Sequence, residues 1–105
     1  MKDEEIATLM RALGHPVRLN ILRIMAKRQH DCCCADVTEY LTLAQSTVSQ
    51  HIKVLINAGL IERRPEGTRN CYILVSSRFD AVQKAFSSLT SGFLELAELN
   101  QTEQE

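Results

Sequence analysis

The sequence lacks any stretch that would cross a membrane and any signature of a catalytic site. None of its apolar runs approaches the roughly 20 residues that a helix needs to span a bilayer. The acidic, amphipathic start MKDEEIATLMRALG does not resemble a secretory signal. A glycine-rich phosphate loop, a carboxylate pair with a histidine, and a Cys–His–Asn arrangement are all missing. We therefore expect a cytoplasmic protein that contacts no membrane and is not an enzyme.

Tryptophan, internal repeats and low-complexity linkers are also missing. The 105 residues are 45% apolar and 24% charged, which is the composition of an ordinary globular protein. A chain of this length fits one domain, over residues 1–105, with little room for a second core. So small a domain buries only part of its surface, which leaves apolar surface for a partner subunit to cover.

Positive charge is scarce in the chain as a whole, whose formal net charge is -1, but it is concentrated in one stretch. Residues 44–78 have a balance of +3, whereas residues 1–43 are neutral and residues 79–105 have a balance of -4. A local positive stretch is what contact with phosphates requires, so the net charge does not exclude a nucleic-acid partner. The acidic end disfavours non-specific binding to DNA.

Both ends of the chain are predicted to be helical. A first helix over 3–13 ends at Gly14, and a second over 16–28 has apolar residues on more than one face, so we expect it at the centre of the fold. A last helix over 78–98 has apolar residues at alternating spacings of 3 and 4, a coiled-coil-like seam: Phe79, Val82, Phe86, Leu89, Phe93 and Leu96. We expect residues 1–13 and 78–98 to pair two chains; the alternative is an intrachain core.

The middle of the chain has the pattern of two short helices joined by a tight turn: residues 35–42, 43–45 and 46–58. Three apolar residues of the first short helix are expected to face inward: Val37, Tyr40 and Leu41. Ser46 or Thr47 is expected to cap the second helix, with Gln50 as the capping-box partner of Thr47. Residues 60–75 then change to strand character on either side of the turn signal Pro65-Glu66-Gly67, which predicts a hairpin.

This order predicts a mainly α fold with a β-hairpin wing (α+β): a winged helix-turn-helix, with the helix-turn-helix over 35–58 and the wing over 60–75. The outer face of the second short helix would present side chains that read base edges or contact phosphates: Gln45, Ser46, Thr47, Ser49, Gln50 and Lys53. The wing would add arginines for phosphates: Arg63, Arg64 and Arg69. Arg69, beside the turn, would also reach the minor groove. The alternative is a small helical protein with a solvated polar face.

The segments LGHPVRLNILRIM (13–25) and LAQSTVSQHIKVLINAGLIERRPEGTRNCYIL (43–74) resemble the ArsR/SmtB family of bacterial metal-sensing repressors. The resemblance extends over residues 5–95. It implies a homodimer joined by its first and last helices, which leaves an inverted-repeat operator when an inducer binds. It also implies base contacts for Gln45, Ser46, Ser49 and Gln50, and a packing or phosphate-contact role for His51. A two-fold dimer would place its recognition helices roughly 34 Å apart on double-stranded DNA.

Four cysteines, Cys32, Cys33, Cys34 and Cys71, are the candidate metal ligands. In a reducing compartment, metal or redox chemistry is a better explanation for them than structural disulfides. Family members with a thiolate sensor carry a Cys-x-Cys-Asp phrase, and here the sequence reads Cys33-Cys34-Ala35-Asp36. By that resemblance Cys33 fills the first cysteine position and Ala35 the second, so the family site is incomplete. The family's other site, on the last helix, is absent because no histidine lies near Asp80.

A different grouping follows from the geometry of winged helices, in which the segment before the short helix often adds a strand beside the second wing strand. That segment, 31–34, would lie next to Cys71, with Cys32 or Cys34 on the face nearest to it. Three thiolates suit a trigonal arsenite-like ion, and four suit zinc or an iron–sulfur cluster. The alternative is that some of these cysteines pack as small apolar residues.

The sequence therefore predicts a DNA-binding transcriptional repressor that responds to a thiophilic metal or metalloid (arsenite-like, cadmium or zinc). The ion would bind to cysteine thiolates and would not be required for the fold. The alternative is a repressor of the same fold that senses an oxidant or reactive sulfur by reversible cysteine oxidation. An interaction module that binds another protein through its helical seam is the contrasting class.

Overall fold

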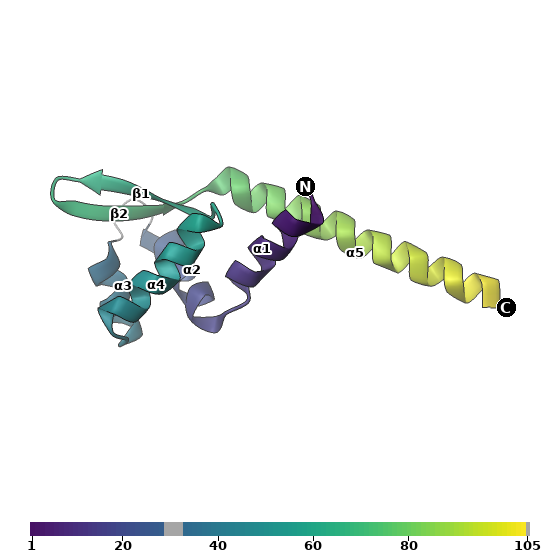
Figure 1. The fold of residues 1–105 in the computed structure, drawn as a ribbon, viewed down its shortest axis with the longest axis horizontal. Coiled ribbons are helices and arrows are strands. Elements are labelled where there is room, and N and C mark those ends of the chain that lie inside the picture. The colour runs from purple at the N-terminus through teal and green to yellow at the C-terminus, as the bar shows by residue number, and fades with distance from the viewer. Residues whose placement is uncertain (29–32, 105) are drawn as a thin grey trace.

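A computed structural model describes residues 1–28 and 33–104, with only the backbone of residue 34 and of residues 102–104 (Figure 1). The elements follow in the order α1 (Asp3–Leu13), α2 (Pro16–Arg28), α3 (Cys34–Leu41), α4 (Gln45–Asn57), β1 (Ile61–Glu66), β2 (Arg69–Leu74) and α5 (Ser76–Gln104). The predicted class, mainly α with a β-hairpin wing, is confirmed. Among the described residues, no helix combines the length and the apolar character needed to cross a membrane.

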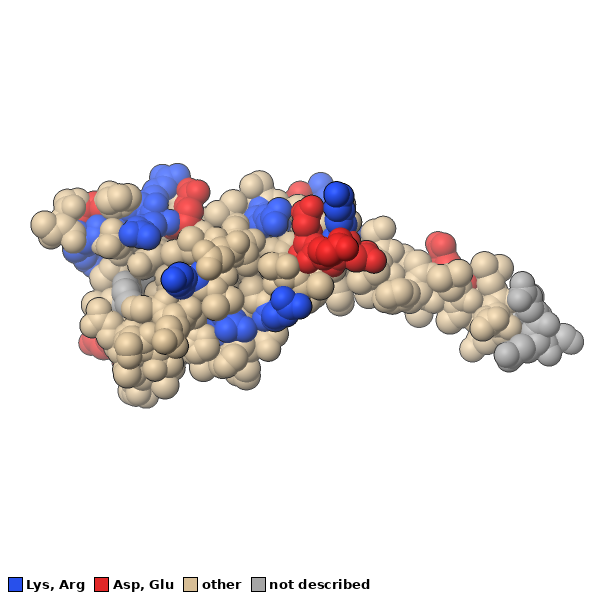
Figure 2. Space-filling view, viewed as in Figure 1, with Lys and Arg blue, Asp and Glu red and all other residues tan. Residues whose placement is uncertain are grey.

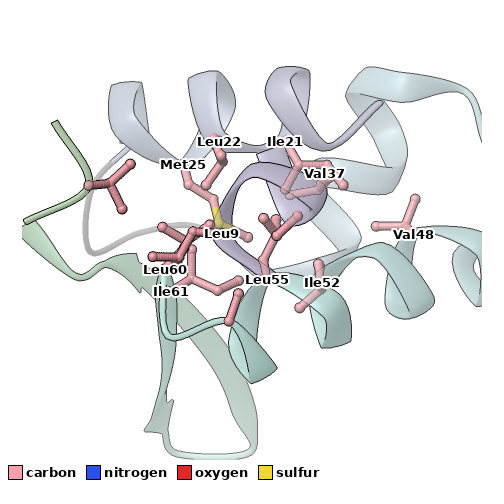
Figure 3. Close-up of a cluster of buried hydrophobic side chains, with 13 residues drawn as sticks. Leu9, Ile21, Leu22, Met25, Val37, Val48, Ile52, Leu55, Leu60 and Ile61 are labelled. Atoms are coloured by element: carbon pink, nitrogen blue, oxygen red, sulfur yellow. The ribbon is translucent and has the colours of Figure 1, made fainter. Parts of the chain in front are cut away.

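The core lies where α1, α2, α3, α4 and the base of the hairpin meet, and α2 contacts every one of them (Figure 3). Side chains with no exposed surface come from each of these elements or their ends: Leu9, Ile21, Met25, Val37, Val48, Leu55 and Leu60. Burying one such side chain contributes about 1.5–3 kcal/mol. The central position predicted for the second helix is therefore confirmed, and its packing fixes how α3 and α4 are oriented.

The two short helices differ from the sequence prediction in their details. Tyr40 does not face inward, because its side chain is 64% exposed, while Val37 is fully buried. The N-cap of α4 is Ala44, which makes no side-chain cap hydrogen bond, so the predicted cap at Ser46 or Thr47 is wrong. The helix begins at Gln45, one residue earlier than the polar pattern indicated, which turns Ser46 and Thr47 into first-turn residues.

The hairpin is antiparallel, with Ile61 opposite Leu74 and Glu66 opposite Arg69. Its turn is therefore Gly67-Thr68 rather than the predicted Pro65-Glu66-Gly67, and Gly67 takes the positive φ of 62° that a tight turn demands. Pro65 belongs to β1, opposite Asn70. A proline is tolerated there because β1 is an edge strand of this two-stranded sheet. No further strand pairs with its outer side, so the N–H that proline lacks is not needed there for a hydrogen bond between strands.

Helix α5 has 29 residues, which makes it about 44 Å long, and much of it projects beyond the rest of the fold (Figure 1). The predicted seam is divided by the structure. Val82 is buried and Phe79 packs against the core, whereas Phe86 is 48% exposed, Phe93 60% and Leu96 66%. The intrachain explanation therefore holds for the start of the seam, whereas its outer part is exposed in the single chain.

An apolar groove runs between α1 and the N-terminal part of α5. It has a volume of about 430 Å³ and is lined by Met10, Leu13, Phe79, Val82, Gln83 and Phe86. The groove thus joins the apolar stripe of the first helix to the seam of the last one, the two surfaces that the sequence assigned to pairing.

Candidate nucleic-acid interface and the adjoining thiol cluster

Helix α4 has one buried face and one exposed polar face. Val48, Ile52 and Leu55 are at most 2% exposed and hold the helix against the core. All six of the side chains that the sequence assigned to DNA contact lie exposed on this helix: Gln45, Ser46, Thr47, Ser49, Gln50 and Lys53. Hydroxyls and amides both donate and accept hydrogen bonds, so this face can pair with base edges in a major groove.

The wing brings basic side chains to the same end of the molecule. Arg63, Arg64 and Arg69 are exposed on the hairpin, and Arg64 also lies 3.5 Å from Glu62. Figure 2 shows lysine and arginine side chains over the hairpin and the helices beside it, whereas the largest acidic patch lies where the N-terminal end of the chain meets α5. The basic end corresponds to the positive stretch 44–78 of the sequence, whereas the acidic patch lies near Asp3, Glu4 and Glu5, in a segment with no net charge. The helix and the wing together form a polar, positively charged end suited to phosphates and bases.

A contact network that the sequence did not predict orients α4. Arg18 of α2 donates hydrogen bonds to the last carbonyls of α1, Ala12 O at 2.6 Å and Arg11 O at 3.0 Å, and its Nη1 lies 3.3 Å from His51 Nδ1. The ring of His15 lies 4.6 Å from that of His51, and its Nδ1 accepts the backbone N–H of Val17 at 3.1 Å. Burial, the neighbouring His15 and Arg18 all lower the pKa of His51. The network therefore ties the ends of α1 and α2 to α4 and favours a neutral His51.

The second feature is a thiol cluster beside the wing. Cys33, the N-cap residue of α3, forms an isolated antiparallel bridge with Cys71 of β2. Cys33, from the segment 31–34 that the sequence placed beside the second wing strand, does lie there; residues 31 and 32 lie outside the described residues. The register differs, however: Cys33, and not Cys32 or Cys34, is opposite Cys71. Cys32 and the side chain of Cys34 lie outside the described residues.

Asp36 and Arg69 contact the Cys33 sulfur, and Arg28 pairs with Asp36. The Asp36 carboxylate accepts the backbone N–H of Cys33 at 2.9 Å and its thiol at 3.2 Å, and lies 3.7 Å from Arg28 and 3.6 Å from Arg69. The backbone hydrogen bond is the main cause that lowers the pKa of Asp36; burial opposes it, and the Cys33 thiol, Arg28 and Arg69 support it. Arg69 also donates a hydrogen bond to Cys33 Sγ at 3.2 Å, and this hydrogen bond is the main cause of the raised pKa of Arg69. A wing residue expected to contact DNA is thus hydrogen-bonded to a thiol.

Cys71 occupies the buried side of this cluster. Its side chain is 1% exposed, and its thiol lies 3.9 Å from Glu66 Oε2. Among the described side chains, which do not include that of Cys34, no three histidine, cysteine or carboxylate groups come together as a metal site would require. The described residues therefore supply two neighbouring thiols, which is too few for the trigonal or tetrahedral set expected from the sequence. Sequence reasoning missed Arg28, and it used Asp36 only to align the family phrase; the contacts of both residues depend on how the end of α2 meets the start of α3.

Comparison with known proteins identifies the family of this chain. Residues 15–63 match the family described as bacterial regulatory protein, arsR family. The HTH-type transcriptional regulator MJ1325 of Methanocaldococcus jannaschii is 36% identical over 88 residues, which cover 84% of this chain and 98% of that protein. The arsenical resistance operon repressor of Staphylococcus xylosus is 29% identical over 84 residues, covering 80% of this chain and 79% of that protein.

Solved structures agree on the fold. The ArsR-like transcriptional regulator from Rhodococcus sp. RHA1 superposes with a TM-score of 0.79, at 18% identity, over 93% of this chain and 92% of that one. The similarity extends well beyond the matched helix-turn-helix segment and includes the hairpin and most of α5. The protein is therefore built like these regulators over nearly its whole length.

Proposed function

Because this chain belongs to the ArsR family of winged helix-turn-helix regulators, and is a DNA-binding transcriptional repressor rather than an enzyme, we propose that α4 reads an inverted-repeat operator from its exposed face. The observation that carries this proposal is the division of α4 into a buried apolar face and an exposed face of six polar side chains. Gln45, Ser46, Ser49 and Gln50 would contact bases. Thr47 and Lys53, with the wing residues Arg63, Arg64 and Arg69, would contact bases or phosphates and set the register.

The repressor would act as a homodimer in the cytoplasm, each chain forming one domain over residues 1–105. Residues 1–13 and 78–98 would form the interface, since the groove between α1 and α5 is apolar and continues into the exposed Phe86, Phe93 and Leu96. Apolar side chains at alternating spacings of 3 and 4 suit a partner helix of the same kind. Two-fold pairing would then present two α4 helices to successive turns of the duplex.

The inducer would be a thiophilic metal or metalloid, such as trivalent arsenic, cadmium or zinc, held by cysteine thiolates. Similarity to a repressor of arsenical resistance and the soft-ligand chemistry of sulfur both support this input. Cys33 and Cys71 would supply two thiolates, and further ligands would have to come from Cys32 or Cys34. Such a site would lie against the wing and the first residue of α3, so a change there acts on the elements that contact DNA.

A second input is favoured by one observation, the direct pairing of Cys33 with Cys71 across two backbone segments. Two adjacent thiols suffice for reversible oxidation by an oxidant or a reactive-sulfur species, without any further ligand. The same repressor would then leave its operator in response to redox state.

The test is a titration of labelled DNA from upstream of the protein's own gene with reduced protein, with and without arsenite, Cd²⁺, Zn²⁺ and a mild oxidant. We expect specific binding by wild type, release by at least one of these agents, and a reduced response in Cys33→Ser. An equal response in Cys33→Ser would exclude Cys33 as an essential sensor residue. Failure to bind any inverted repeat would favour an interaction module instead.

A pair of charge variants makes the DNA contact itself testable. Lys53→Ala and Lys84→Ala each remove one positive charge, but only Lys53 lies on the exposed face of α4, whereas Lys84 pairs with Asp80 at 3.0 Å on α5. Lys53→Ala should weaken binding to all sequences and reduce the salt slope by about 1, while Lys84→Ala should leave both unchanged. Equal effects of the two substitutions would contradict the proposed interface.

A further inference from the structure

The backbone geometry of the thiol cluster is that of a cross-strand cysteine pair. In an antiparallel bridge the two partner residues lie directly opposite each other, with their Cα atoms about 4.5–5.5 Å apart. A disulfide requires a Cα separation of about 4.4–6.8 Å. The bridge between Cys33 and Cys71 therefore places these residues within range of a disulfide without a change of register, and both are thiols in this structure.

The two thiols differ in access and in charge environment. Cys33 is partly exposed, whereas Cys71 is 1% exposed. The Cys33 sulfur accepts a hydrogen bond from Arg69 at 3.2 Å, and its thiol proton points to an Asp36 oxygen at 3.2 Å. A guanidinium against a partly exposed sulfur is the kind of surrounding in which cysteines react, while a buried cysteine reacts only with what lies beside it. Cys33 is thus placed to meet a reagent from solvent first, and Cys71 to react second.

We propose that Cys33 and Cys71 form a reversible intrachain disulfide when Cys33 reacts with a hydroperoxide. The Cys33 sulfur attacks one peroxide oxygen, the O–O bond breaks, and a sulfenic acid and one water (or alcohol) are produced. The Cys71 sulfur then attacks Cys33 Sγ: the S–S bond forms, the S–O bond of the sulfenic acid breaks, and the departing hydroxide takes up the Cys71 thiol proton and leaves as a second water. The two sulfurs lose two electrons, and the peroxide gains them. This inference rests on the proposed repressor function only for its effect on DNA.

Arg69 connects this chemistry to the wing. In the reduced protein its guanidinium is held by Cys33 Sγ and by Asp36, at 3.2 and 3.6 Å, so the arm of β2 next to the turn is tied to the start of α3. Disulfide formation draws the Cys33 sulfur toward Cys71 and removes the thiol partner of Arg69. The wing arginine then keeps only its ion pair with Asp36 and is held less firmly beside the helix-turn-helix, so operator binding weakens, by at least about fivefold if the coupling has an ordinary magnitude.

Peptide mapping tests the disulfide directly. Trypsin places Cys33 and its two neighbours on the peptide 29–53 and Cys71 on the peptide 70–78. The variant Cys32→Ser/Cys34→Ser retains only the proposed pair. After treatment with hydrogen peroxide and alkylation of remaining thiols, we expect the two peptides to be joined within one chain and separated by dithiothreitol. Cys71→Ala in the same background should instead stop at a Cys33 sulfenic acid, which dimedone traps.

Three results would overturn the inference. The first is a stable Cys33 sulfenic acid although Cys71 is present, and the second is a disulfide found only between two chains on a non-reducing gel. The third is that the disulfides of the wild type are confined to the peptide 29–53. Arg69→Ala tests the connection to DNA, because its operator affinity should respond much less to peroxide than that of wild type; an equal response would remove Arg69 from the mechanism. The mass measurement needs no DNA. If peroxide forms the disulfide in a protein that binds no operator, the proposed function alone is refuted. If the protein binds its operator and is released by arsenite but forms no disulfide with peroxide, this inference alone is refuted.

Discussion

Asp36→Ala should destabilise the protein measurably, because this one carboxylate connects four groups. It accepts the Cys33 backbone N–H at 2.9 Å and the thiol at 3.2 Å, and it lies within 3.7 Å of Arg28 and Arg69. A hydrogen bond to a charged acceptor contributes about 1.5–3 kcal/mol. The two ion pairs add little, since the Arg69 side chain is 55% exposed and the Arg28 side chain 33%. We expect a loss of about 1.5–3 kcal/mol in the free energy of unfolding.

Urea denaturation at neutral pH measures this loss, and thermal unfolding should show a fall in Tm of roughly 6–12 °C. The matched control is Glu39→Ala, which removes an exposed carboxylate from the same helix and should change stability by less than about 0.5 kcal/mol. Equal losses in the two variants would refute the argument that the Asp36 contacts stabilise the start of α3.

The same substitution should change the dependence of stability on pH. The folded protein lowers the pKa of Asp36 below its ordinary value of 3.8, so the stabilisation is fully present above pH 3.8 and is lost as the pH falls through the lower folded value. Asp36→Ala should therefore lose less stability than wild type during acidification in that range. Identical acid profiles would contradict the assignment.

Three further predictions concern other parts of the molecule. Phe93 is 60% exposed in the single chain, so Phe93→Glu should convert the proposed dimer to monomer with little loss of helix content. Analytical ultracentrifugation measures the mass and circular dichroism the helix content. An unchanged mass would place the interface elsewhere. Burial, His15 and Arg18 make protonation of His51 less favourable in the folded chain than in the unfolded one, so wild type should lose stability as the pH falls below 6.5. His51→Gln should make this loss smaller. Urea midpoints that fall in parallel in the two proteins across that range would argue against it. Thr42→Gly should stabilise the protein by about 0.5–1 kcal/mol, since this C-cap residue of α3 has a φ of 51° that disfavours a β-branched side chain; a lower melting temperature would disprove the reasoning.

Much of the fold could be predicted because the local apolar pattern and the tertiary packing agree. The ends of α1 and α2 were predicted to the residue, since Gly14 and Pro16 punctuate the chain between them. The end of α5 was placed at residue 98, whereas the helix continues to Gln104. That extension has little apolar pattern, and helix continuation there depends on propensity alone.

The hairpin turn was misplaced for a different reason. A proline followed two residues later by a glycine is a strong turn signal, but it does not distinguish a proline inside a turn from one on an edge strand before the turn. The register, with Pro65 opposite Asn70, is set by which residues of β1 and β2 face the core, Ile61, Tyr72 and Leu74 among them. Which strand residues become buried depends on the elements packed against the hairpin, so the sequence of either strand alone does not show the register.

The candidate DNA-contacting side chains could be selected from sequence, because a helix with one apolar face must expose the other. The thiol cluster could be predicted only as a neighbourhood. Deciding that Cys33 is the residue opposite Cys71 requires the path of the chain into α3, and the contacts of Asp36 with Arg28 and Arg69 join three separate elements. The contact between Arg18 and His51 is likewise tertiary, joining residues 33 positions apart.

The length of α5 has a consequence for the amount of protein that a cell must hold. A helix whose outer turns project beyond the rest of the described fold gains little from folding alone, since isolated helices are marginal in water. If those turns are ordered by a second copy, then the order of the tail and the association of the chains are one equilibrium, and both increase with the number of molecules present. In that case, a cell that dilutes this repressor by growth would lose ordered, associated chains more steeply than it loses chains in total.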